Sequence, residues 1–400
     1  MADDTYILDL WVTGAEAVSV HDDGSGSDTI RVTGVYSATI DIDLAYTVVS
    51  GTPLNAGSRY FSADNQSHQL VIYGLIENAF GSNGSEYING NDLANLLGGD
   101  QKQTGPGLSD TLDGGGGNDT MFGGSGDDLL SGQSDADAIW GDAGNDSIAG
   151  GTGCDTVQGG AGADTLDGGG DAGDTLSYAT SRRGVQVVLQ AGVVTTGHGG
   201  DAEGDLIAGF ADVIGTAFAD RIEVADKTAL PFGQSDNGLY GGGGRDRIAG
   251  GGGDDLIFGG MASDNLLGEA GNDSLTGNVG KDRLSGGVGS DVLSGGGGPD
   301  SFVFQTTGDS AADNADVITD FSRLEQDKID LQAMDANWRV VGNQAFHLIT
   351  GDFTGHPGEL RFQLQGADLL VSGDASGDGQ ADFVIVVQNC QQVVAEDFVL

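Results

Sequence analysis

The sequence predicts an all-β chain folded as a right-handed parallel β-roll, a solenoid whose short strands stack coil upon coil. Three observations predict this fold class. Glycine is the commonest residue, with 74 among 400 residues, whereas proline occurs only 5 times. A nine-residue pattern recurs in two long blocks. In each copy, a glycine-rich half that favours a turn precedes a half centred on one apolar side chain, which favours a short strand.

The two blocks hold seven units each, in Gly105–Asp167 and Gly241–Val303. Gly114–Phe122, which reads GGGGNDTMF, is a clear example, and the eighth position is apolar in every unit, from Leu112 to Phe302. The sixth position is aspartate in all fourteen units: Asp110, Asp119, Asp128, Asp137, Asp146, Asp155, Asp164, Asp246, Asp255, Asp264, Asp273, Asp282, Asp291 and Asp300. A register this regular predicts one structural role for each position.

Glycine holds the second and fourth positions of the clearest units, where its access to positive φ suits a turn. These glycines are Gly115, Gly117, Gly124, Gly126, Gly151, Gly153, Gly160, Gly162, Gly242, Gly244, Gly251, Gly253, Gly287 and Gly289. Other residues replace glycine at the second position (Gln133, Asp142, Glu269, Asn278) and at the fourth (Asp135, Ala262).

Stacking of the units brings the aspartates together. Two units form one coil, and successive coils lie about 4.8 Å apart. Asp119 is therefore expected beside Asp137 at one edge, and Asp128 beside Asp146 at the other. Two carboxylates about 5 Å apart repel by roughly 1–3 kcal/mol. Each coil buries only two apolar side chains, too few to order a glycine-rich coil, so the metal-free roll is expected to be marginal or unfolded.

A divalent cation between coils would reverse this repulsion. Calcium fits because it accepts six to eight oxygen ligands in irregular geometry, which the aspartates and the carbonyl groups of the glycines named above can supply. Zinc is disfavoured, because the repeats contain no recurring His or Cys. Pairing units two apart predicts about ten calcium sites.

A second cation loop is predicted at Asp374–Asp382, which reads DASGDGQAD. Its oxygen-bearing residues Asp374, Ser376, Asp378 and Asp382, with a glycine at position six, match part of an EF-hand loop. The closing glutamate is replaced by Ile385, and a solvated acidic turn is the alternative.

Charge and composition exclude several classes of protein. Acidic residues outnumber basic ones by 61 to 15, a net charge of −46 that disfavours nucleic acid and anionic membranes as partners. No apolar run is long enough for a transmembrane helix. The first eleven residues lack a basic segment and a long apolar core, so no Sec-type signal peptide is expected. Cys154 and Cys390 are expected to be separate thiols.

Five segments are expected along the chain. They are a strand-rich N-terminal segment (1–80), a first β-roll (81–176), a β-rich spacer (177–214), a second β-roll (215–303) and a C-terminal cap (304–400). In the cap we expect strands at Phe302–Gln305, Val317–Phe321, Ile329–Leu331, Gly358–Leu364 and Asp382–Val387.

The units resemble the G-G-x-G-x-D-x-U-x repeat of RTX calcium-binding proteins. The wider pattern resembles the C-terminal half of serralysin-type secreted proteases: Ile76–Leu97 is similar to the entry into their roll and Asp300–Leu331 to the exit. The end, Asp397–Leu400, resembles their secretion tail. The resemblance implies a secreted, extracellular protein exported by a type I secretion apparatus, unfolded inside the cell and folded outside.

The protease motif of that family is missing. The histidines never form H-E-x-x-H, and neither G-x-S-x-G nor a Walker loop occurs, so no catalytic residue is assigned. Three functions stay open. One is a structural or surface-associated calcium-binding protein, for which a cell-surface or matrix component is a candidate partner. Another is an enzyme whose active site lies in residues 1–80 or 175–212. The third is an accessory module of a secreted hydrolase or other enzyme that is encoded separately.

Overall fold

The computed structural model describes residues 5–9, 18–21, 29–33, 39–43, 68–73, 78–80, 85–92, 94–99, 108–169, 173–225 and 236–400. The start of the first repeat unit, at Gly105, lies outside these residues. The chain divides into two compact units. The first comprises residues 1–178 and 191–210, and the second comprises residues 179–190 and 211–400. The spacer between the repeat blocks thus contributes to both units.

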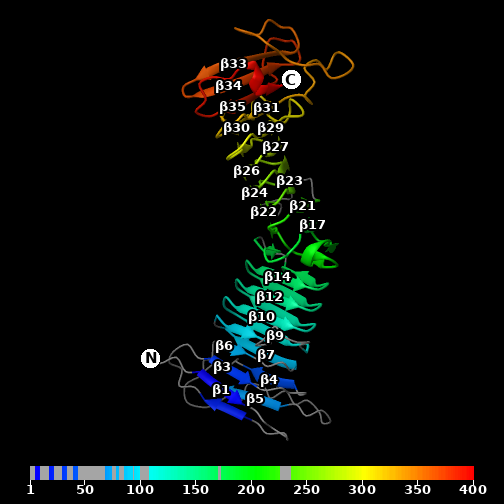
Figure 1. The fold of residues 1–400 in the computed structure, drawn as a ribbon, viewed down its shortest axis with the longest axis vertical. Helices are drawn as coiled ribbons and strands as arrows, with labels where there is room; N and C mark the ends of the chain where they lie inside the picture. The colour runs from blue at the N-terminus through cyan, green and yellow to red at the C-terminus, as the bar shows by residue number, and fades with distance from the viewer. Residues whose placement is uncertain are drawn as a thin grey trace. The chain divides into compact units, whose positions relative to one another are not determined.

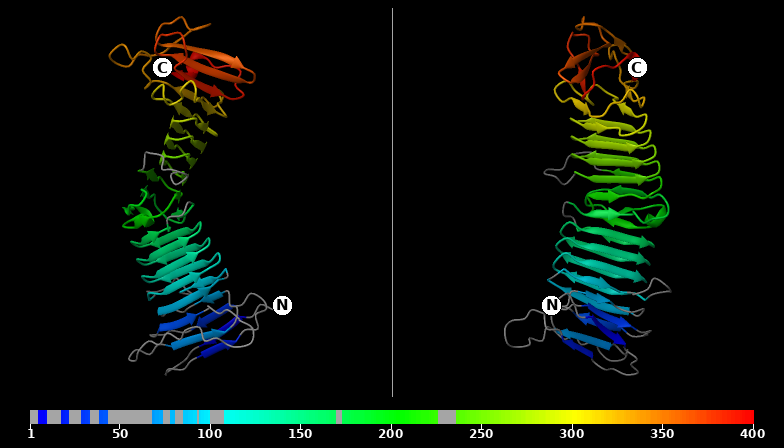
Figure 2. Two further views of the ribbon diagram at one scale, coloured as in Figure 1. Left: turned by 180° about the vertical axis from the view of Figure 1, so that it is seen from behind. Right: turned by 60° about the vertical axis from the view of Figure 1, so that its left-hand side comes forward.

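The first unit consists of two stacks of parallel strands (Figures 1 and 2). One stack contains, in spatial order, β1 (Thr5–Asp9), β3 (Thr29–Thr33), β6 (Asn78–Phe80), β8 (Leu96–Gly98), β10 (Thr120–Ser125), β12 (Ala138–Ala143), β14 (Thr156–Ala161) and β16 (Thr175–Ser177). The other contains β2 (Val18–His21), β5 (His68–Tyr73), β4 (Thr39–Asp43), β7 (Ser85–Asn91), β9 (Thr111–Gly115), β11 (Leu129–Ser134), β13 (Ser147–Thr152), β15 (Thr165–Asp167) and β19 (Leu206–Ala208). The N-terminal strands therefore continue the stacks of the repeats.

Two short elements of the spacer complete the first unit. The strand β18 (Thr195–Thr196) pairs antiparallel with β19, and η1 (Gly200–Ala202) is a single 3-10 turn.

The second unit is also built from two stacks. One contains β17 (Gln186–Leu189), β21 (Arg221–Val224), β23 (Arg247–Gly252), β25 (Asn265–Ala270), β27 (Arg283–Val288), β29 (Ser301–Val303), β31 (Lys328–Asp330) and β36 (Phe398–Val399), all parallel. The other contains β20 (Asp212–Ile214), β22 (Gly238–Gly243), β24 (Leu256–Met261), β26 (Ser274–Val279), β28 (Val292–Ser294), β30 (Asp316–Ile318) and β35 (Phe383–Val387).

The C-terminal cap changes the strand direction. β35 pairs antiparallel with β34 (Asp368–Asp374), which pairs antiparallel with β33 (Glu359–Gln365), and β32 (His347–Leu348) lies at the edge. η2 (Ala395–Asp397) leads into the last strand. The strand β34 was not expected from the sequence, because its apolar run is short and ends in the acidic loop.

The register confirms a coil of two units. Met121 of β10 pairs with Ile139 of β12, eighteen residues later, and Ile257 of β24 pairs with Leu275 of β26. The eighth-position side chains form the core and are 0–2% exposed in every repeat unit. The fold is therefore the predicted parallel β-roll.

The strands are longer than the three-residue half of each unit. β24 begins at position seven of one unit and ends at position three of the next, so the two glycines lie inside the strand. The prediction that this glycine pair lies outside the strand was wrong, whereas the predicted positive φ is observed at its second residue (113° at Gly260). The strand pairing continues through the pair because each strand has a neighbour in register on both sides.

Among the described residues, we find no helix with the length and apolar character needed to cross a membrane.

Candidate metal centres

Each repeat aspartate lies in the turn immediately before a strand, with its side chain inside the coil. All fourteen are 0–3% exposed. Charged side chains are rarely buried this deeply without a partner. The structure therefore places every predicted aspartate where its charge must be compensated.

The aspartates are joined into columns by backbone hydrogen bonds. The N–H of each aspartate donates to Oδ1 of the aspartate one coil later, at 2.7–2.9 Å within the repeats. Column A contains Asp119, Asp137 and Asp155; column B contains Asp110, Asp128, Asp146 and Asp164; column C contains Asp255, Asp273 and Asp291; column D contains Asp246, Asp264, Asp282 and Asp300. The stacking expected for Asp119 and Asp137 is confirmed.

The second carboxylate oxygen, Oδ2, does not share in these hydrogen bonds. Oδ2 is buried and has no hydrogen-bond partner in Asp119, Asp137, Asp146, Asp164, Asp246, Asp255, Asp264, Asp273, Asp282, Asp291 and Asp300. A buried polar atom without a partner is unfavourable by about 1–3 kcal/mol, and more when it is charged. A column of such oxygens matches the ligand preference of calcium, which binds oxygen at about 2.3–2.6 Å.

Burial of these carboxylates also changes their pKa values. Burial is the largest cause and raises the pKa, the backbone N–H hydrogen bond lowers it, and neighbouring carboxylates raise it again. The pKa rises to about 8 for Asp146 and Asp273, to about 7 for Asp119, Asp137, Asp164, Asp246, Asp255 and Asp300, and to about 6 for Asp264 and Asp291. Without a cation, the columns would hold protons near neutral pH.

Glycine at the first position makes room for the carboxylate. A Cβ added at Gly132 would lie 2.2 Å from Oδ2 of Asp137 and 2.5 Å from the carbonyl oxygen of Gly150. A Cβ at Gly268 would meet Asp273 and Gly286 in the same way, at 2.2 and 2.5 Å. No side chain fits between these oxygens.

Carbonyl oxygens of the second and fourth positions point toward the next coil. A Cβ at Gly160, in the second position, would lie 2.0 Å from the carbonyl oxygen of Asp142. A Cβ at Gly271, in the fourth, would lie 1.7 Å from that of Gly253. Backbone carbonyl groups are among the oxygen ligands that calcium accepts, so their position between coils agrees with the predicted ligand set.

The residues that replace glycine adopt its backbone conformation. Gln133, Asp135, Asp142, Ala262, Glu269 and Asn278 all have φ between 71° and 82°. Such angles are uncommon for residues with a side chain. The turn geometry is therefore retained in the degenerate units, so these coils can present the same carbonyl groups.

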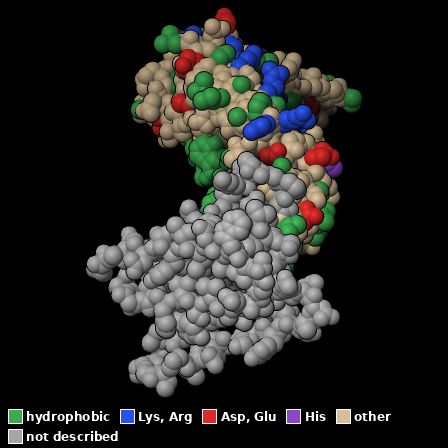
Figure 3. Space-filling model, turned by 60° about the horizontal axis from the view of Figure 1, so that its bottom comes forward, with side chains coloured by type: hydrophobic (Ala, Val, Ile, Leu, Met, Phe, Trp, Pro, Cys, Tyr) green, Lys and Arg blue, Asp and Glu red, His purple; other side chains and the backbone are tan. Residues whose placement is uncertain are grey.

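Among the described residues, no basic side chain forms an ion pair with the columns of the second unit, although the charge of Arg245 lowers the pKa of Asp264. In Figure 3, most of the visible Lys and Arg side chains gather in one group on the coloured surface, with Asp and Glu side chains scattered around it. Arg221 pairs with Glu223, and Arg283 pairs with Asp330 at 3.1 Å. In the described part of the chain, no aspartate of columns C and D takes part in an ion pair of this kind.

A cluster of three carboxylate, imidazole or thiolate side chains close enough to hold a metal does not occur among the described residues. Any site between coils must therefore combine the carboxylates of adjacent coils with backbone carbonyl groups. This division of ligands is accessible to calcium but not to zinc.

The structure extends the columns beyond the repeats. Asp174 accepts from Asp155 in column A, Asp205 from Asp164 in column B, Asp316 from Asp291 in column C, and Asp327 from Asp300 in column D, all at 2.9–3.0 Å. Asp220, in a degenerate unit before the second block, begins column D by donating to Asp246 at 2.8 Å.

Sequence reasoning missed Asp174, Asp205, Asp316 and Asp327 because none lies in the exact nine-residue register. Asp174 and Asp205 follow glycine-rich stretches (GGGDAG and GGDAEG), whereas Asp316 and Asp327 do not. A signal was nevertheless present. Each is followed two residues later by a fully or almost fully buried apolar side chain: Leu176, Ile207, Ile318 and Ile329. The same order, an aspartate followed two residues later by a buried apolar residue, occurs at positions six to eight of every repeat unit.

The loop at Asp374–Asp382 connects β34 and β35. Two of its carboxylates accept hydrogen bonds from backbone N–H groups of the loop itself. Asp374 accepts the N–H groups of Gly377 at 2.5 Å and Gly379 at 2.8 Å. Asp382 accepts those of Ala375 and Ser376, both at 2.7 Å. These contacts describe a turn closed by its own side chains. A calcium ion in this loop stays a prediction from the sequence.

Comparisons with known proteins agree with the repeats. Residues 107–139 and 140–173 match the RTX calcium-binding nonapeptide repeat, and residues 236–400 match the peptidase M10 serralysin C terminal. A search of the curated proteins finds no significant match.

Solved structures with similarity to this chain include two subunits of the Azotobacter vinelandii mannuronan C5-epimerase, both solution structures. AlgE6R2 is 25% identical, with 38% of this chain and 91% of that chain covered at a TM-score of 0.29. AlgE6R3 is 26% identical, with 43% of this chain and 82% of that chain covered at a TM-score of 0.25.

Parallel coils, buried aspartate columns and the family matches agree: residues 107–173 carry RTX calcium-binding nonapeptide repeats. The second repeat block of the chain and its cap form a serralysin-type C-terminal segment.

Proposed function

We propose that this chain is a secreted protein that binds about ten calcium ions between the coils of its two rolls and folds only when they bind. The observation that supports this is the set of buried Oδ2 atoms without a protein partner. The ligands would be the aspartates of columns A to D together with carbonyl groups of the glycine-rich turns. Bound calcium supplies the positive charge that the columns lack.

Calcium-dependent folding is tested by circular dichroism on the full chain. In chelator the β-sheet signal should be largely absent, because the carboxylates of each column repel one another and each coil buries little apolar surface. Millimolar calcium should restore it, since extracellular calcium modules bind at roughly 10⁻⁴–10⁻³ M. Magnesium is the control, because it requires near-ideal octahedral geometry and should restore much less. A chelated sample with the full β-sheet signal and an unchanged melting temperature would falsify the proposal.

We also propose that export precedes folding. A serralysin-type C-terminal segment supports export by a type I apparatus, which threads an unfolded chain. Low calcium inside the cell would keep the rolls unfolded, and higher calcium outside would fold them by mass action. Deletion of residues 351–400 should leave the protein inside a host that carries a matched exporter. A host without the transporter is the control. Unimpaired export of the truncated chain, or export without the transporter, contradicts this part.

The proposed role of the folded protein is structural or surface-associated. The sequence contains no H-E-x-x-H, G-x-S-x-G or Walker motif. Within the spacer, the buried Asp205 ends column B, where it accepts hydrogen bonds from the N–H of Asp164 in the preceding coil and from the buried hydroxyl of Tyr178. Protease, lipase and glycan-lyase assays on purified, calcium-loaded protein test the role. Activity in any of them would favour the alternative, a module of a secreted enzyme.

A further inference from the structure

Basic side chains form a straight row on one sheet of the second unit. In the stack from β21 to β31, the residue just before each buried core position points outward, because successive side chains of a strand alternate between its faces. The register places six such residues opposite one another on neighbouring strands: Arg221, Arg247, Asn265, Arg283, Ser301 and Lys328. We call the four cations of this row, Arg221, Arg247, Arg283 and Lys328, the basic ladder.

Among the described repeat strands, the ladder occurs in this stack only. The equivalent rows of the other three stacks consist of uncharged residues: Thr111, Leu129, Ser147 and Thr165; Thr120, Ala138 and Thr156; and Leu256, Ser274 and Val292. Basic residues are scarce, with 15 in the chain against 61 acidic ones. Cations that only diluted the acidic charge would be spread over all stacks, so their alignment in one row indicates a local role.

The rows on either side of the ladder strengthen its positive charge or leave it unchanged. On the turn side, Arg245 and Lys281 precede two of the ladder cations by two residues and are both exposed. On the strand side, the register aligns uncharged residues beside the middle of the ladder: Ala249, Leu267 and Ser285. The centre of the row therefore has no acidic neighbour on these strands.

Ion pairs with acidic side chains involve two of the ladder cations. Glu223 of β21 pairs with Arg221, and Asp330 of β31 pairs with Arg283 at 3.1 Å. Within the described part of the chain, Arg247 takes part in no ion pair. The side chains of Arg221 and Arg283 stay 46% and 47% exposed, so the ladder is open to a ligand from solvent.

Compensation of column D is the alternative role of the ladder. Asp246 and Asp282 of that column directly follow Arg245 and Lys281 in the turns. The aspartates of column D are, however, only 1–3% exposed, and among the described residues none of them forms an ion pair with the ladder. Calcium in the column would satisfy these carboxylates and leave the ladder cations to an external anion.

The dimensions of the ladder favour a narrow, extended ligand. The row spans five strand intervals, roughly 24 Å at about 4.8 Å each. Charges act over about 8 Å at physiological ionic strength, so an anionic ligand that stays on the row is attracted by the ladder and escapes the acidic surface beyond it. A planar anionic membrane or a DNA duplex is wider and would meet that acidic surface as well.

The side chains along the row favour a carboxylate-bearing sugar chain over a nucleic acid. Single-stranded nucleic acid is narrow but depends on aromatic side chains on which its bases stack. Neither the ladder row nor the strand-side row contains an aromatic residue. Guanidinium groups bind carboxylates through two parallel hydrogen bonds. A linear polysaccharide with carboxylates at regular intervals therefore matches both the shape and the chemistry of the row.

We propose that the basic ladder binds a linear acidic polysaccharide, which lies across the strands with its carboxylates on the arginine side chains. The inference rests on the proposed surface-associated role of the folded protein and names the chemical class of its partner. Affinity should fall as salt is added, because exposed charges are screened.

Calorimetric titration of the calcium-saturated full chain with oligomers of galacturonic acid tests the proposal. These oligomers carry one carboxylate on each sugar and are chosen long enough to span the ladder. A titration into calcium buffer without protein corrects for calcium bound by the sugar. We expect binding of these oligomers and none of neutral dextran oligomers of the same length. Absence of binding, or tighter binding of a single-stranded oligonucleotide of equal charge, overturns the proposal.

Two double variants locate the site. Arg247→Ser with Arg283→Ser removes two ladder cations and should weaken binding about tenfold. Serine already occupies this row at Ser301, so the strands should be retained. Arg339→Ser with Arg361→Ser is the matched control, because it removes the same charge from the cap, and it should bind as the parent does. Equal affinities of the two double variants overturn the proposal.

A further variant decides the case in which the first double variant does not fold. Glu223→Gln removes the acidic partner of Arg221 and should bind the galacturonate oligomers several-fold more tightly. An unchanged or weaker affinity would contradict the ladder. A chain that keeps its full β-sheet signal in chelator would instead refute the proposed calcium-dependent folding, and the same titration then tests the ladder on that chain.

Discussion

The two carboxylate oxygens of the repeat aspartates have different surroundings, and each oxygen has its own effect on the fold. Oδ1 is held by the backbone N–H of the previous coil, as in the 2.8 Å contact from Asp255 to Asp273. Oδ2 is left inside the coil without a donor in Asp273. The first contact aligns adjacent coils, and the second creates the requirement for a cation.

At Asp273, substitution by alanine should remove both functions. The N–H of Asp255 loses its acceptor, which costs about 1–3 kcal/mol for a buried group. We expect fewer bound calcium ions and a weaker second repeat block, while the first block stays largely formed because solenoid units depend mainly on their neighbours. Calorimetric titration and calcium-dependent melting measure both effects.

The control for this substitution is Asp313→Ala, which removes the same charge from an exposed position in the second unit. It should leave the calcium stoichiometry at the parental value. If Asp273→Ala titrates with the same stoichiometry and midpoint as the parent, Asp273 is not a ligand.

The fourth position of the repeat offers a test of backbone strain. Ala262 has φ of 82°, where glycine is favoured, so Ala262→Gly should stabilise the calcium-loaded protein by about 1 kcal/mol. Gly271→Ala makes the reverse change at the same position, and its Cβ would lie 1.7 Å from the carbonyl oxygen of Gly253. It should destabilise by more than 1 kcal/mol. Denaturant unfolding in calcium should show opposite signs for the two variants; equal signs would contradict the assigned turn geometry.

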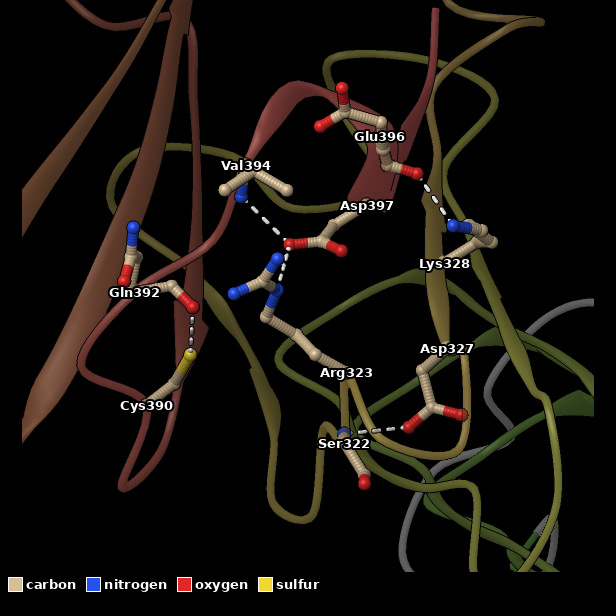
Figure 4. Close-up of polar contacts among 9 residues, drawn as sticks. All are labelled: Ser322, Arg323, Asp327, Lys328, Cys390, Gln392, Val394, Glu396 and Asp397. Carbon is tan, nitrogen blue, oxygen red and sulfur yellow. Dashed lines mark hydrogen bonds and ion pairs between the residues drawn. The ribbon is translucent and has the colours of Figure 1, made fainter.

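At the scale of elements, the C-terminal tail is the last strand of a roll. β36 pairs in parallel with β31, and Leu331 donates its N–H to the carbonyl oxygen of Val399 at 2.8 Å. Figure 4 shows how the residues before β36 are held: Asp397 accepts from Arg323 and from the N–H of Val394, at 2.8 and 2.7 Å. The segment that resembles a secretion signal is thus part of the folded cap.

Replacing Arg323 should loosen this strand. Arg323→Ala leaves the largely buried carboxylate of Asp397 without its cation, at a cost of about 1–3 kcal/mol. Amide hydrogen exchange at Leu331 and in β36 should become faster, while exchange in β24 stays unchanged. Arg361→Ala is the control, because its partner Asp352 is fully exposed and such a pair contributes about 1 kcal/mol or less. Equal protection of β36 in both variants would show that the ion pair does not hold the tail.

At the scale of the whole molecule, the columns should make stability depend on pH with opposite signs in the two calcium states. Ten of the repeat aspartates have folded-state pKa values raised to about 6–8. At pH values above the ordinary pKa of 3.8, the metal-free fold therefore binds more protons than the unfolded chain. Their contribution to stability is complete below that value and is lost as pH rises through the raised pKa values. In chelator, the β-sheet signal should therefore be larger at about pH 5 than at about pH 8.

Saturating calcium should invert this dependence, since the ion binds carboxylates and protons compete with it. The calcium-loaded protein should melt at a lower temperature at about pH 5 than at about pH 8. Circular dichroism at both pH values, with and without calcium, measures the effect. A β-sheet signal that grows with pH in chelator would contradict the raised pKa values.

The period, the core and the columns within each block follow from the order of the amino acids alone. A nine-residue repeat has one apolar position and one aspartate, so stacking two units per coil places each of them above its equivalent eighteen residues away, as Met121 above Ile139 and Asp119 above Asp137. Local chemistry and a constant period are sufficient for this, because every neighbour is the same number of residues away.

The ends of the columns, and the groups that bind the last carboxylate of each, depend instead on how the chain packs in three dimensions. Asp291 reaches Asp316 over 25 residues, Asp300 reaches Asp327 over 27, and Asp164 reaches Asp205 over 41. These separations follow from loops of different lengths, which no period predicts. The hydroxyl of Tyr178 donates to Oδ2 of Asp205, although Tyr178 precedes Asp205 by 27 residues and belongs to no sequence motif. Such contacts are set by packing in three dimensions, because a buried carboxylate must find a donor or a cation wherever the fold brings one within reach.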